Sequence, residues 1–279
     1  MSNREITVNF IYRPDNKAAL VWEKKIRQWL KKKYPQVKVV NKNSRFIIVL
    51  GGDGTILEAA RKYHNHGPII FGLNLGQVGF LAAVREEEKF LAGLDKLFRG
   101  RYQVVERMML QAKVRRNNRS VFIAHALNEV VAQSLIGMVD LKVLIDGGPI
   151  QDIRGTGILI STATGSTSFN LSAHGPIMMP DMKGFIVTEL MDHNIPSPSL
   201  IVKNKQIQLK VASFRERGLL SVTETGEKVD VVLIADGAQL FPLKEGDLIN
   251  ITRSPKLARF VELEKNYFFK SLQEKFSFK

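Results

Sequence analysis

The chain of 279 residues contains no cysteine. This absence excludes disulfide bonds, thiol nucleophiles and cysteine-ligated zinc, and it fits a cytoplasmic location. Long apolar runs are also missing, since none approaches the roughly 18 residues that a membrane-spanning helix needs. Residues 1–5 are polar and lead straight into an apolar run, which is not the layout of a signal peptide. We therefore expect a cytoplasmic protein without membrane contact.

Acidic side chains are scarce: 27 Asp and Glu stand against 41 Lys and Arg, a formal net charge of +14. Such a surface attracts anions, among them nucleic acids, phosphorylated cofactors and polyphosphate, unless it is merely a solvated basic surface. The basic stretches at 31–33, 115–116 and 203–210 are dispersed and are not interleaved with aromatic residues. A platform for single-stranded nucleic acid needs that interleaving. The charge therefore favours small polyanionic ligands over nucleic acid.

The first hundred residues alternate between two kinds of pattern. Short, nearly continuous apolar runs predict buried strands, and apolar residues at helical spacing predict helices between them. The expected strands are 6–12, 46–50 and 68–73, and the expected helices are 17–33, 55–63 and 86–98. Buried strands alternating with helices are typical of a parallel sheet covered on both faces. We predict an α/β Rossmann-like domain over residues 1–102.

After residue 103 the helical spacing gives way to short apolar runs separated by turn residues. The expected strands are 109–114, 121–126, 130–133, 139–145, 207–211, 219–223, 231–235 and 248–252, with a hairpin turn at Asp146-Gly147. We predict a mostly β, sandwich-like or closed domain over residues 103–254. Residues 255–279 are expected to pack back on the first domain, with the aromatic and basic tail 260–279 as a helix.

The strongest chemical signal is the string Gly51, Gly52, Asp53, Gly54, Thr55 between a buried strand and a helix. Glycines let phosphates approach the main chain, and a helix N-terminus offers unpaired N–H groups and a favourable dipole. A carboxylate would repel that ligand unless it accepts a proton from an attacking hydroxyl or helps to hold Mg²⁺. The alternative is an ordinary tight turn. We favour phosphoryl transfer with Asp53 as the base.

Other catalytic motifs are missing from the sequence. There is no Walker loop, no spaced Rossmann fingerprint, no nucleophile elbow and no zinc-protease motif. The five histidines, at positions 64, 66, 125, 174 and 193, form no convincing ligand set. We therefore assign no metal-binding side chain, and expect Mg²⁺ or another divalent cation to be held mainly by donor phosphates.

The glycine string is shared by a superfamily of NAD kinases, diacylglycerol and sphingosine kinases, and phosphofructokinases. Three further segments select one branch, because residues 72–81, 126–131 and 157–177 resemble NAD kinase segments in type and order. The chain is thus similar to the NAD kinase family over about residues 46–180. The resemblance implies transfer of the γ-phosphate of ATP, or of polyphosphate, to the 2′-hydroxyl of the adenosine ribose of NAD, giving NADP.

The same resemblance implies a binding site. Asn128 and Glu129 suit a ribose diol, since an amide both donates and accepts whereas an ionised carboxylate only accepts. The hydroxyl-rich run 161–168 suits a dinucleotide, although a polar loop capping a helix near Thr164 would look the same. The implied binding residues outside the glycine string are Asn74, Asn128, Glu129, Arg154, Thr156, Thr164, Thr167, Ser168, Phe169, Asn170, Ser172 and Asp236. Arg154 is expected beside the cofactor phosphates, and a plain hairpin turn would also explain Asp236-Gly237.

Departures from the family pattern fall around the nicotinamide half of the implied substrate. Thr156 replaces a usual aspartate, and Ser168-Phe169 replaces Ala-Tyr, which keeps an aromatic face but loses a hydroxyl. His174 stands where glycine is common, and Ala238 where glutamine often follows. These changes leave the preference between NAD and NADH open.

Two rival functions remain at this level: a lipid kinase of the same superfamily, and a non-catalytic basic protein that binds nucleotides or nucleic acid. The first would not be expected to carry segments 126–131 and 157–177, and the intact Asp53 disfavours the second. The family resemblance also suggests a homo-oligomer, either a dimer or a tetramer, that binds small nucleotides.

Overall fold

The structure is a computed structural model that describes residues 6–64, 67–76, 79–193, 197–203, 205–221, 226–265 and 267–276. Residues 77 and 78 of the motif at 72–81, and His66, lie outside this description. The chain divides into two compact units: unit 1 comprises Met1–Arg107 and Lys256–Lys279, and unit 2 comprises Met108–Pro255. The domain boundaries expected from the sequence stay predictions.

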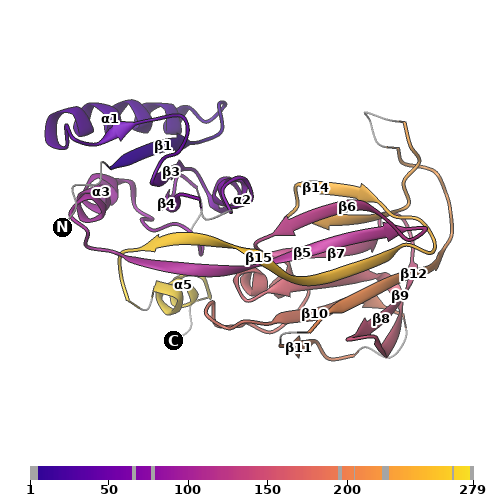
Figure 1. Cartoon of the computed structure of the whole chain (residues 1–279). Coiled ribbons are helices and arrows are strands. Elements are labelled where there is room, and N and C mark those ends of the chain that lie inside the picture. The colour runs from indigo at the N-terminus through magenta and orange to yellow at the C-terminus, as the bar shows by residue number, and fades with distance from the viewer. Residues whose placement is uncertain are drawn as a thin grey trace. The chain divides into compact units, whose positions relative to one another are not determined.

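Unit 1 is the α/β part of the chain. Its elements are β1 (Thr7–Ile11), α1 (Lys17–Lys33), β2 (Lys38–Val39), β3 (Phe46–Leu50), α2 (Asp53–Lys62), β4 (Ile69–Leu73), the 3₁₀ helix η1 (Glu87–Lys89), α3 (Phe90–Phe98) and α5 (Tyr267–Phe276). The strands form a parallel sheet in the order β2-β1-β3-β4, and α1 lies beside β1 (Figure 1). Every residue of β3 and β4 is buried, as predicted for a sheet covered on both faces.

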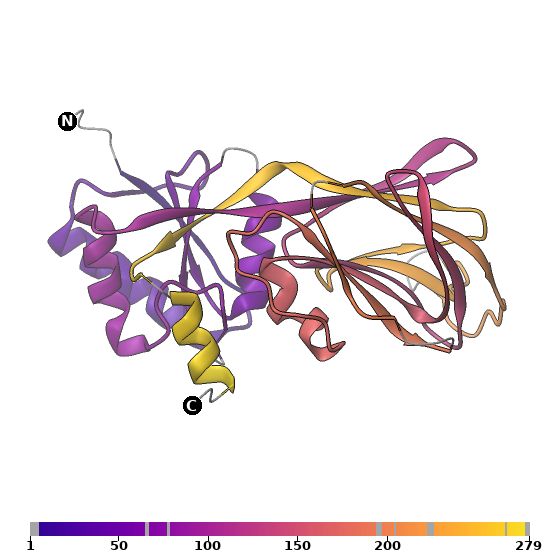
Figure 2. The same cartoon turned by 90° about the horizontal axis from the view of Figure 1, so that it is seen from below.

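The C-terminal segment of unit 1, Lys256–Lys279, contributes one strand that pairs with the parallel sheet and one helix. The long strand β15 (Leu248–Glu262) places Phe260 opposite Ile70 of β4, in parallel orientation. Helix α5 follows and lies beside other elements of unit 1, where it is drawn in yellow (Figure 2). The predicted tail helix is therefore present, but residues 260–262 belong to a strand and the helix begins at Tyr267.

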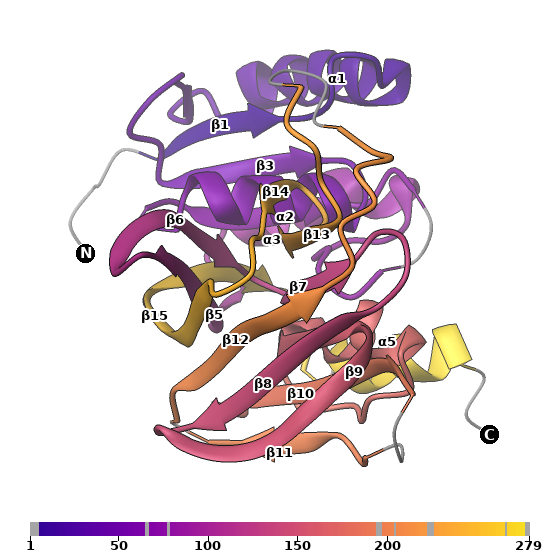
Figure 3. The ribbon, with the colours of Figure 1, turned by 90° about the vertical axis from the view of Figure 1, so that its right-hand side faces the viewer.

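Unit 2 is mostly β. Its remaining elements are β5 (Gln103–Arg116, beginning in unit 1), β6 (Arg119–Ala126), β7 (Glu129–Ser134), β8 (Val139–Ile145), β9 (Gly148–Thr162), η2 (Thr164–Thr167), α4 (Phe169–Ser172), β10 (Phe185–Asp192), β11 (Leu200–Val202), β12 (Ile207–Phe214), β13 (Val231–Ala235) and β14 (Gln239–Pro242). Antiparallel pairing gives the order β14-β13-β7-β9-β8-β12-β15. Strand β10 joins β9 to β11, and these strands lie together with β8 in Figure 3.

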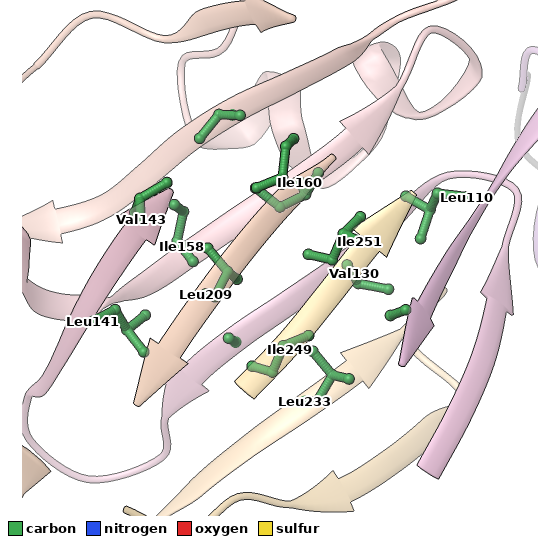
Figure 4. Packing of buried hydrophobic residues seen from close by; sticks show 14 of the residues in the cluster. Leu110, Val130, Leu141, Val143, Ile158, Ile160, Leu209, Leu233, Ile249 and Ile251 are labelled. Carbon is green, nitrogen blue, oxygen red and sulfur yellow. The ribbon is translucent and has the colours of Figure 1, made fainter. Parts of the chain in front are cut away.

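The core of unit 2 collects alternate side chains from most of its strands. Ile158 and Ile160 of β9 point into a large apolar cluster with residues of β5, β7, β8, β12, β13 and β15 (Figure 4). Leu159, between them, packs on the opposite face with Val131 and Leu190. Strand β9 is thus buried on both faces towards its end, where Ser161 pairs with Glu129 of β7. This packing fixes the position of the hydroxyl-rich segment that follows.

Turn chemistry explains one prediction that is confirmed and one that is wrong. Asp146 and Gly147 both adopt positive φ, 49° and 82°, and close the predicted β8–β9 hairpin. The strand expected at 219–223 does not form over Leu219 and Leu220, which are exposed, and Ser221 makes only an isolated bridge with Lys228. The main-chain N–H groups of the preceding residues 217 and 218 donate to the Asp230 carboxylate instead of a neighbouring strand. Residues 222 and 223 lie outside the description.

None of the helices within the described ranges combines the length and apolar composition needed to cross a membrane.

Candidate functional site

In unit 1 the glycine string joins the buried strand β3 to helix α2. The Gly51 N–H donates to the Leu73 carbonyl of β4 at 3.1 Å, and Gly52 is the N-cap residue of α2. A Cβ atom at Gly51 would lie 2.5 Å from Thr55 Oγ1, so this position requires glycine. A Cβ atom at Gly52 would meet no heavy atom within 4 Å, and Gly54 is exposed, which leaves space above the helix N-terminus. That arrangement suits phosphate groups.

Asp53 is the first residue of α2, so the helix begins two residues earlier than predicted. Its carboxylate accepts hydrogen bonds from the main-chain N–H groups of Phe80, at 2.8 Å, and Leu81, at 3.3 Å. Gly79 packs directly against this carboxylate, since a Cβ atom there would lie 2.3 Å from it. The segment after β4 therefore fixes the orientation of Asp53.

Burial raises the pKa of the Asp53 carboxyl above its ordinary value. The N–H groups of Phe80 and Leu81 and the positive charges of Lys275 and Arg85 act in the opposite direction, because they favour the ionised form. A carboxylate whose pKa is raised by burial is a stronger proton acceptor than an exposed one once it is ionised. This property matches the role of a general base.

Asn74 lies in the turn after β4 and is 3% exposed. Its Nδ2 donates to the Gly76 carbonyl at 2.9 Å, and its main-chain N–H donates to the Val84 carbonyl. Gly72, in β4, allows close packing, because a Cβ atom there would lie 2.7 Å from Ile56 of α2. The described residues of the motif, 72–76 and 79–81, thus pack around the glycine string and Asp53. The separate positions of the two motifs in the sequence did not reveal this contact.

In unit 2, Asn128 immediately precedes strand β7, and Glu129 is the first residue of that strand. Thr162 and Ser161, at the end of β9, donate to the Asn128 carbonyl at 2.8 and 3.3 Å. The carboxylate of Asp236 accepts from the main-chain N–H groups of residues 127, 128 and 129 at 2.9, 2.8 and 3.2 Å. Asp236 therefore holds the Asn128-Glu129 segment in place, and it also lies in the β13–β14 hairpin turn that was the alternative interpretation of Asp236-Gly237. A direct contact between Asp236 and a ligand stays a prediction.

The Glu129 side chain is 7% exposed, and its Oε2 has no hydrogen-bond partner in the described part of the chain. Its Oε1 accepts from the Ser168 hydroxyl at 3.5 Å. Burial, reinforced by the negative charge of Asp236, raises the pKa of Glu129 to about 8. An unsatisfied buried carboxyl oxygen is costly, and a bound hydroxyl would satisfy it.

The hydroxyl-rich segment forms a 3₁₀ turn, η2, followed by the short helix α4. Thr162 Oγ1 donates to the Leu127 carbonyl at 2.6 Å, and Ser166 Oγ to the Ala163 carbonyl at 2.7 Å. Gly165 packs so closely that a Cβ atom would lie 2.3 Å from the Asn128 carbonyl. Several of these hydroxyls therefore fold the segment and fix it against β7, in agreement with the capping alternative.

The residues of this segment that the sequence predicts to bind a ligand differ in their exposure to solvent. Asn170 is fully buried: its amide donates to the Ser166 and Pro176 carbonyls and accepts from Thr188. We therefore assign Asn170 a structural role in place of the expected contact with a ligand. Thr167 is nearly buried and bonds to the Thr164 carbonyl. Thr164 and Ser168 are half-buried, whereas Phe169 and Ser172 are exposed and open to a ligand.

Arg154 and Thr156 lie on β9 but away from this group. Arg154 is exposed, stands opposite Asp140 in the β8–β9 ladder and forms a long ion pair with it at 3.7 Å. From Arg154 to Ser161 the extended strand runs roughly 23 Å, at about 3.3 Å per residue. Unit 2 by itself therefore does not bring Arg154 together with Glu129.

Among the described residues, no three His, Asp or Glu side chains gather as a metal-binding group. Two of the described histidines make other contacts, His64 with Lys256 and His125 with Ser254. His174 has a φ of 61°, which explains why glycine is common at this position.

Comparison with known proteins now decides the family. The model of the ATP-NAD kinase N-terminal domain matches residues 17–102, and that of the ATP-NAD kinase C-terminal domain matches residues 127–263. The NAD kinase of Carboxydothermus hydrogenoformans is 36% identical over 232 residues, covering 82% of this chain and 78% of that protein. The chain belongs to the NAD kinase family. The predictions of family, phosphotransferase activity and NAD kinase function are confirmed.

Two solved structures share the fold. Yeast NADH kinase complexed with NADH superposes with a TM-score of 0.87 at 20% identity, over 100% of this chain and 89% of that one. An NAD kinase from Archaeoglobus fulgidus in complex with ATP gives a TM-score of 0.75 at 25% identity, over 96% and 99%. The predicted fold class, an α/β N-terminal part and a mostly β C-terminal part, is confirmed. The lipid-kinase and nucleic-acid-binding alternatives find no support among these relatives.

Sequence reasoning misses several residues around Asp53. Gly79, Phe80 and Leu81 belong to a motif to which the sequence assigns no role, yet they contact the carboxylate. Nothing in the sequence singles out Lys275 and Arg85, although both charges act on Asp53. The spacing of glycines in 72–81 carries a signal for the first group. No local pattern points to Arg85, which lies just beyond that motif, or to Lys275, 222 positions after Asp53.

Proposed function

We propose that the chain transfers the γ-phosphate of ATP to the 2′-hydroxyl of the adenosine ribose of NAD, with Asp53 as the base. The observation that carries this proposal is the partly desolvated Asp53 carboxylate at the N-terminus of α2, oriented by two main-chain N–H groups. It stands where the glycine string offers a phosphate site, so the proton acceptor and the donor's phosphates share one loop.

ATP is the proposed donor. The NAD kinase from Archaeoglobus fulgidus, 25% identical to this chain, was solved in complex with ATP. The space above Gly52 and the exposed main chain at Gly54 suit its phosphates. Polyphosphate remains an alternative donor, since the loop would contact phosphate oxygens and not the nucleoside.

Mg²⁺ is the proposed metal, and the residues present fit it. This ion keeps several waters and commonly takes one or two carboxylates plus substrate phosphates, not a full set of protein ligands. The space above Gly52 and the exposed Gly54 leave room for donor phosphates, whose oxygens would hold the ion, while Asp53 serves as the base. When bound, the ion would neutralise charge on the donor phosphates.

On the acceptor side, we assign Asn128 and Glu129 to the adenosine ribose. Both are 7% exposed, and Glu129 Oε2 is a buried oxygen without a partner in the described residues. A ribose hydroxyl would supply that missing hydrogen bond, whether it donates to an ionised Glu129 or accepts from a protonated one. Productive transfer then requires NAD to present its 2′-hydroxyl to Asp53.

The remaining proposed contacts of NAD come from segment 164–172 and from strand β9. Phe169 is 40% exposed and offers a ring face for stacking, and Ser168, Thr164 and Ser172 present hydroxyls near it in sequence. Thr156 and Arg154 stay proposed contacts of the nicotinamide half and the phosphates. Because Thr156 and Ser168-Phe169 depart from the family pattern, we leave NAD and NADH as competing acceptors.

In the proposed mechanism, the site first binds and orients both substrates, and the phosphoryl transfer follows. The glycine string and α2 hold the donor, Asn128 and Glu129 orient the ribose, and Asp53 takes the proton from the 2′-hydroxyl as it attacks phosphorus. The base is expected to supply about 10²–10⁴-fold of the rate. The remainder comes from aligned reactants and neutralised phosphate charge.

The direct test is NADP formation by purified protein with NAD, ATP and Mg²⁺, read by an NADP-specific dehydrogenase. We expect Asp53→Asn to lower kcat by about 10²–10⁴-fold with little change in either KM, because the general base is lost and the binding groups remain. Asp152→Asn, on an exposed position of β9, is the matched control. Full activity of Asp53→Asn would overturn the assignment, and folded protein that makes no NADP with ATP or polyphosphate would overturn the reaction.

A cytoplasmic location and a homo-oligomer, dimer or tetramer, complete the proposal. The first is supported by the lack of cysteine and the second by the family resemblance. Light scattering coupled to gel filtration measures the oligomeric state directly.

A further inference from the structure

The Asp53 carboxylate is oriented from outside its own helix. Phe80 and Leu81 donate their main-chain N–H groups to Oδ2 and Oδ1, and Gly79 lies against the carboxylate with no space for a side chain. We call residues 79–85 the brace. A shift of the brace would turn or release the carboxylate, so whatever holds the brace also acts on the proposed base.

The second half of the brace is held by the sheet. The N–H groups of Ala83 and Val84 both donate to the Gly72 carbonyl, at 2.9 and 3.1 Å, and the Val84 carbonyl accepts from Asn74. These contacts tie residues 83–84 to β4. They do not reach Phe80 and Leu81, which carry the two donors to Asp53.

The first half of the brace is held by α5. The Phe80 side chain is 9% exposed, and its ring lies 5.9 Å from Phe268 and 6.3 Å from Phe276 of α5. The Tyr267 hydroxyl donates to the Ala82 carbonyl. Thus α5 contacts the brace through side chain and main chain on both sides of Leu81.

An ionic cluster anchors the same helix at the end of the brace. Arg85 pairs with Glu274, donates to Ser271 Oγ and to Tyr267 Oη, and lies over the Tyr267 ring at 4.3 Å. Its side chain is 11% exposed. Because Arg85 belongs to the brace and the other three residues to α5, this cluster fixes the relative position of the two.

We propose that α5 is a positioning element for catalysis: by packing on Phe80 and Ala82 it holds the N–H groups that orient the Asp53 carboxylate. The proposal rests on the proposed role of Asp53 as base. Phe268 and Tyr267 are positioning residues in this scheme, since they act through the brace and touch neither substrate. A helix from the far end of the sequence thereby controls the rate of the step at the glycine string.

The test compares two phenylalanines on the same helix. Phe268→Ala removes the ring against Phe80. Phe269→Ala removes a neighbouring ring that is 50% exposed and meets Phe268 edge to face, so it controls for the loss of an aromatic side chain from α5. We expect Phe268→Ala to lower kcat by about tenfold or more with both KM values nearly unchanged, because a small misplacement of a catalytic group costs rate and not binding. Phe268→Leu, which keeps apolar volume, should restore most of the rate, and Phe269→Ala should match the wild type.

Amide hydrogen exchange gives a readout that is independent of activity. In Phe268→Ala the amides of Phe80 and Leu81 should exchange at least about tenfold faster, while those of β7 keep wild-type rates because the core of unit 2 is untouched. Unchanged exchange at Phe80 and Leu81 would overturn the proposal. If the wild-type protein makes no NADP, the proposed function fails, yet the exchange experiment still decides whether α5 holds the brace.

A double-mutant cycle separates positioning from general stability. In an Asp53→Asn background, Phe268→Ala should have little further effect on the residual rate, because the group through which it acts is already disabled. Equal loss in both backgrounds, or parallel rises in KM, would show that α5 merely stabilises the unit and would overturn the proposal.

Discussion

At the scale of single residues, Asp53 and Glu129 are two carboxylates in different electrostatic settings. Burial raises the pKa of both. The Asp53 carboxylate accepts two main-chain hydrogen bonds and lies within the electrostatic influence of the positive charges of Lys275 and Arg85. All four interactions favour its ionised form. The Glu129 carboxyl group accepts one weak hydrogen bond from a hydroxyl. The negative charge of Asp236 disfavours the ionised form of Glu129. Asp53 is therefore suited to take a proton, and Glu129 is suited to remain protonated beside a ribose.

The raised pKa of Glu129 predicts a pH-dependent stability. Glu129 has a pKa of about 8 in the folded state and an ordinary pKa near 4.5 in the unfolded state. At pH values between these two, the carboxyl group is protonated in the folded state and ionised in the unfolded state. The free energy of unfolding should therefore fall as pH rises from about 5 to about 8, by on the order of a few kcal/mol at most. Urea unfolding at several pH values measures this fall.

Glu129→Gln removes the titrating group and keeps its shape, so we expect the variant to lose less stability than the wild type over the same pH range. Glu88→Gln, at an exposed position of η1, is the control and should follow the wild-type curve. Identical curves for Glu129→Gln and the wild type would contradict the assignment of a protonated, buried Glu129.

At the scale of elements, the chain contains two Asp-Gly hairpin turns that look alike in sequence. Asp146 has a φ of 49° and Asp236 a φ of 46°, and a glycine with positive φ follows each. Asp146 is exposed and bonds to Lys205 and to the Gln206 N–H. Asp236 is 8% exposed and accepts three main-chain N–H groups at the start of β7. Only the second turn organises a candidate site.

This pair of turns gives a matched prediction. Asp236→Asn should destabilise the protein by about 1–3 kcal/mol, because an amide oxygen cannot satisfy three buried donors. It should also raise KM for NAD more than KM for ATP, since the Asn128-Glu129 segment loses its support. Asp146→Asn should change both quantities far less. Thermal unfolding and steady-state kinetics measure the two effects, and equal effects of the two substitutions would contradict this role for Asp236.

At the scale of the whole molecule, the net charge of +14 predicts a salt effect on substrate binding. ATP and NAD both carry negative charge, so screening between about 50 and 500 mM salt should raise their KM values. The value of kcat should change less, because contacts within the glycine string are short and partly desolvated. Kinetics at constant Mg²⁺ measure this, and a KM independent of salt would show that the basic surface is only a solvated surface.

The secondary-structure elements differ in how well the sequence predicts their bounds. Strand β3 has the bounds that the sequence predicts, because five consecutive buried residues followed by glycines leave little choice. The predicted start of α2 is wrong by two residues, and the strand predicted at 219–223 is wrong where a side chain competes for main-chain hydrogen bonds, as Asp230 does at residues 217 and 218. The sequence gives no reason why glycine is common at position 174, and the positive φ of His174 supplies one.

Residue types at short, fixed spacings are enough to predict the family and the two kinds of unit, and they single out Asp53 as the candidate base. What surrounds these residues is visible only in the folded chain. Asn170 is a fully bonded structural amide, Asp236 supports the Asn128-Glu129 segment, and α5 packs on the segment that orients Asp53. Such contacts join positions far apart in the chain, and they arise from packing and hydrogen-bond geometry that no local pattern records.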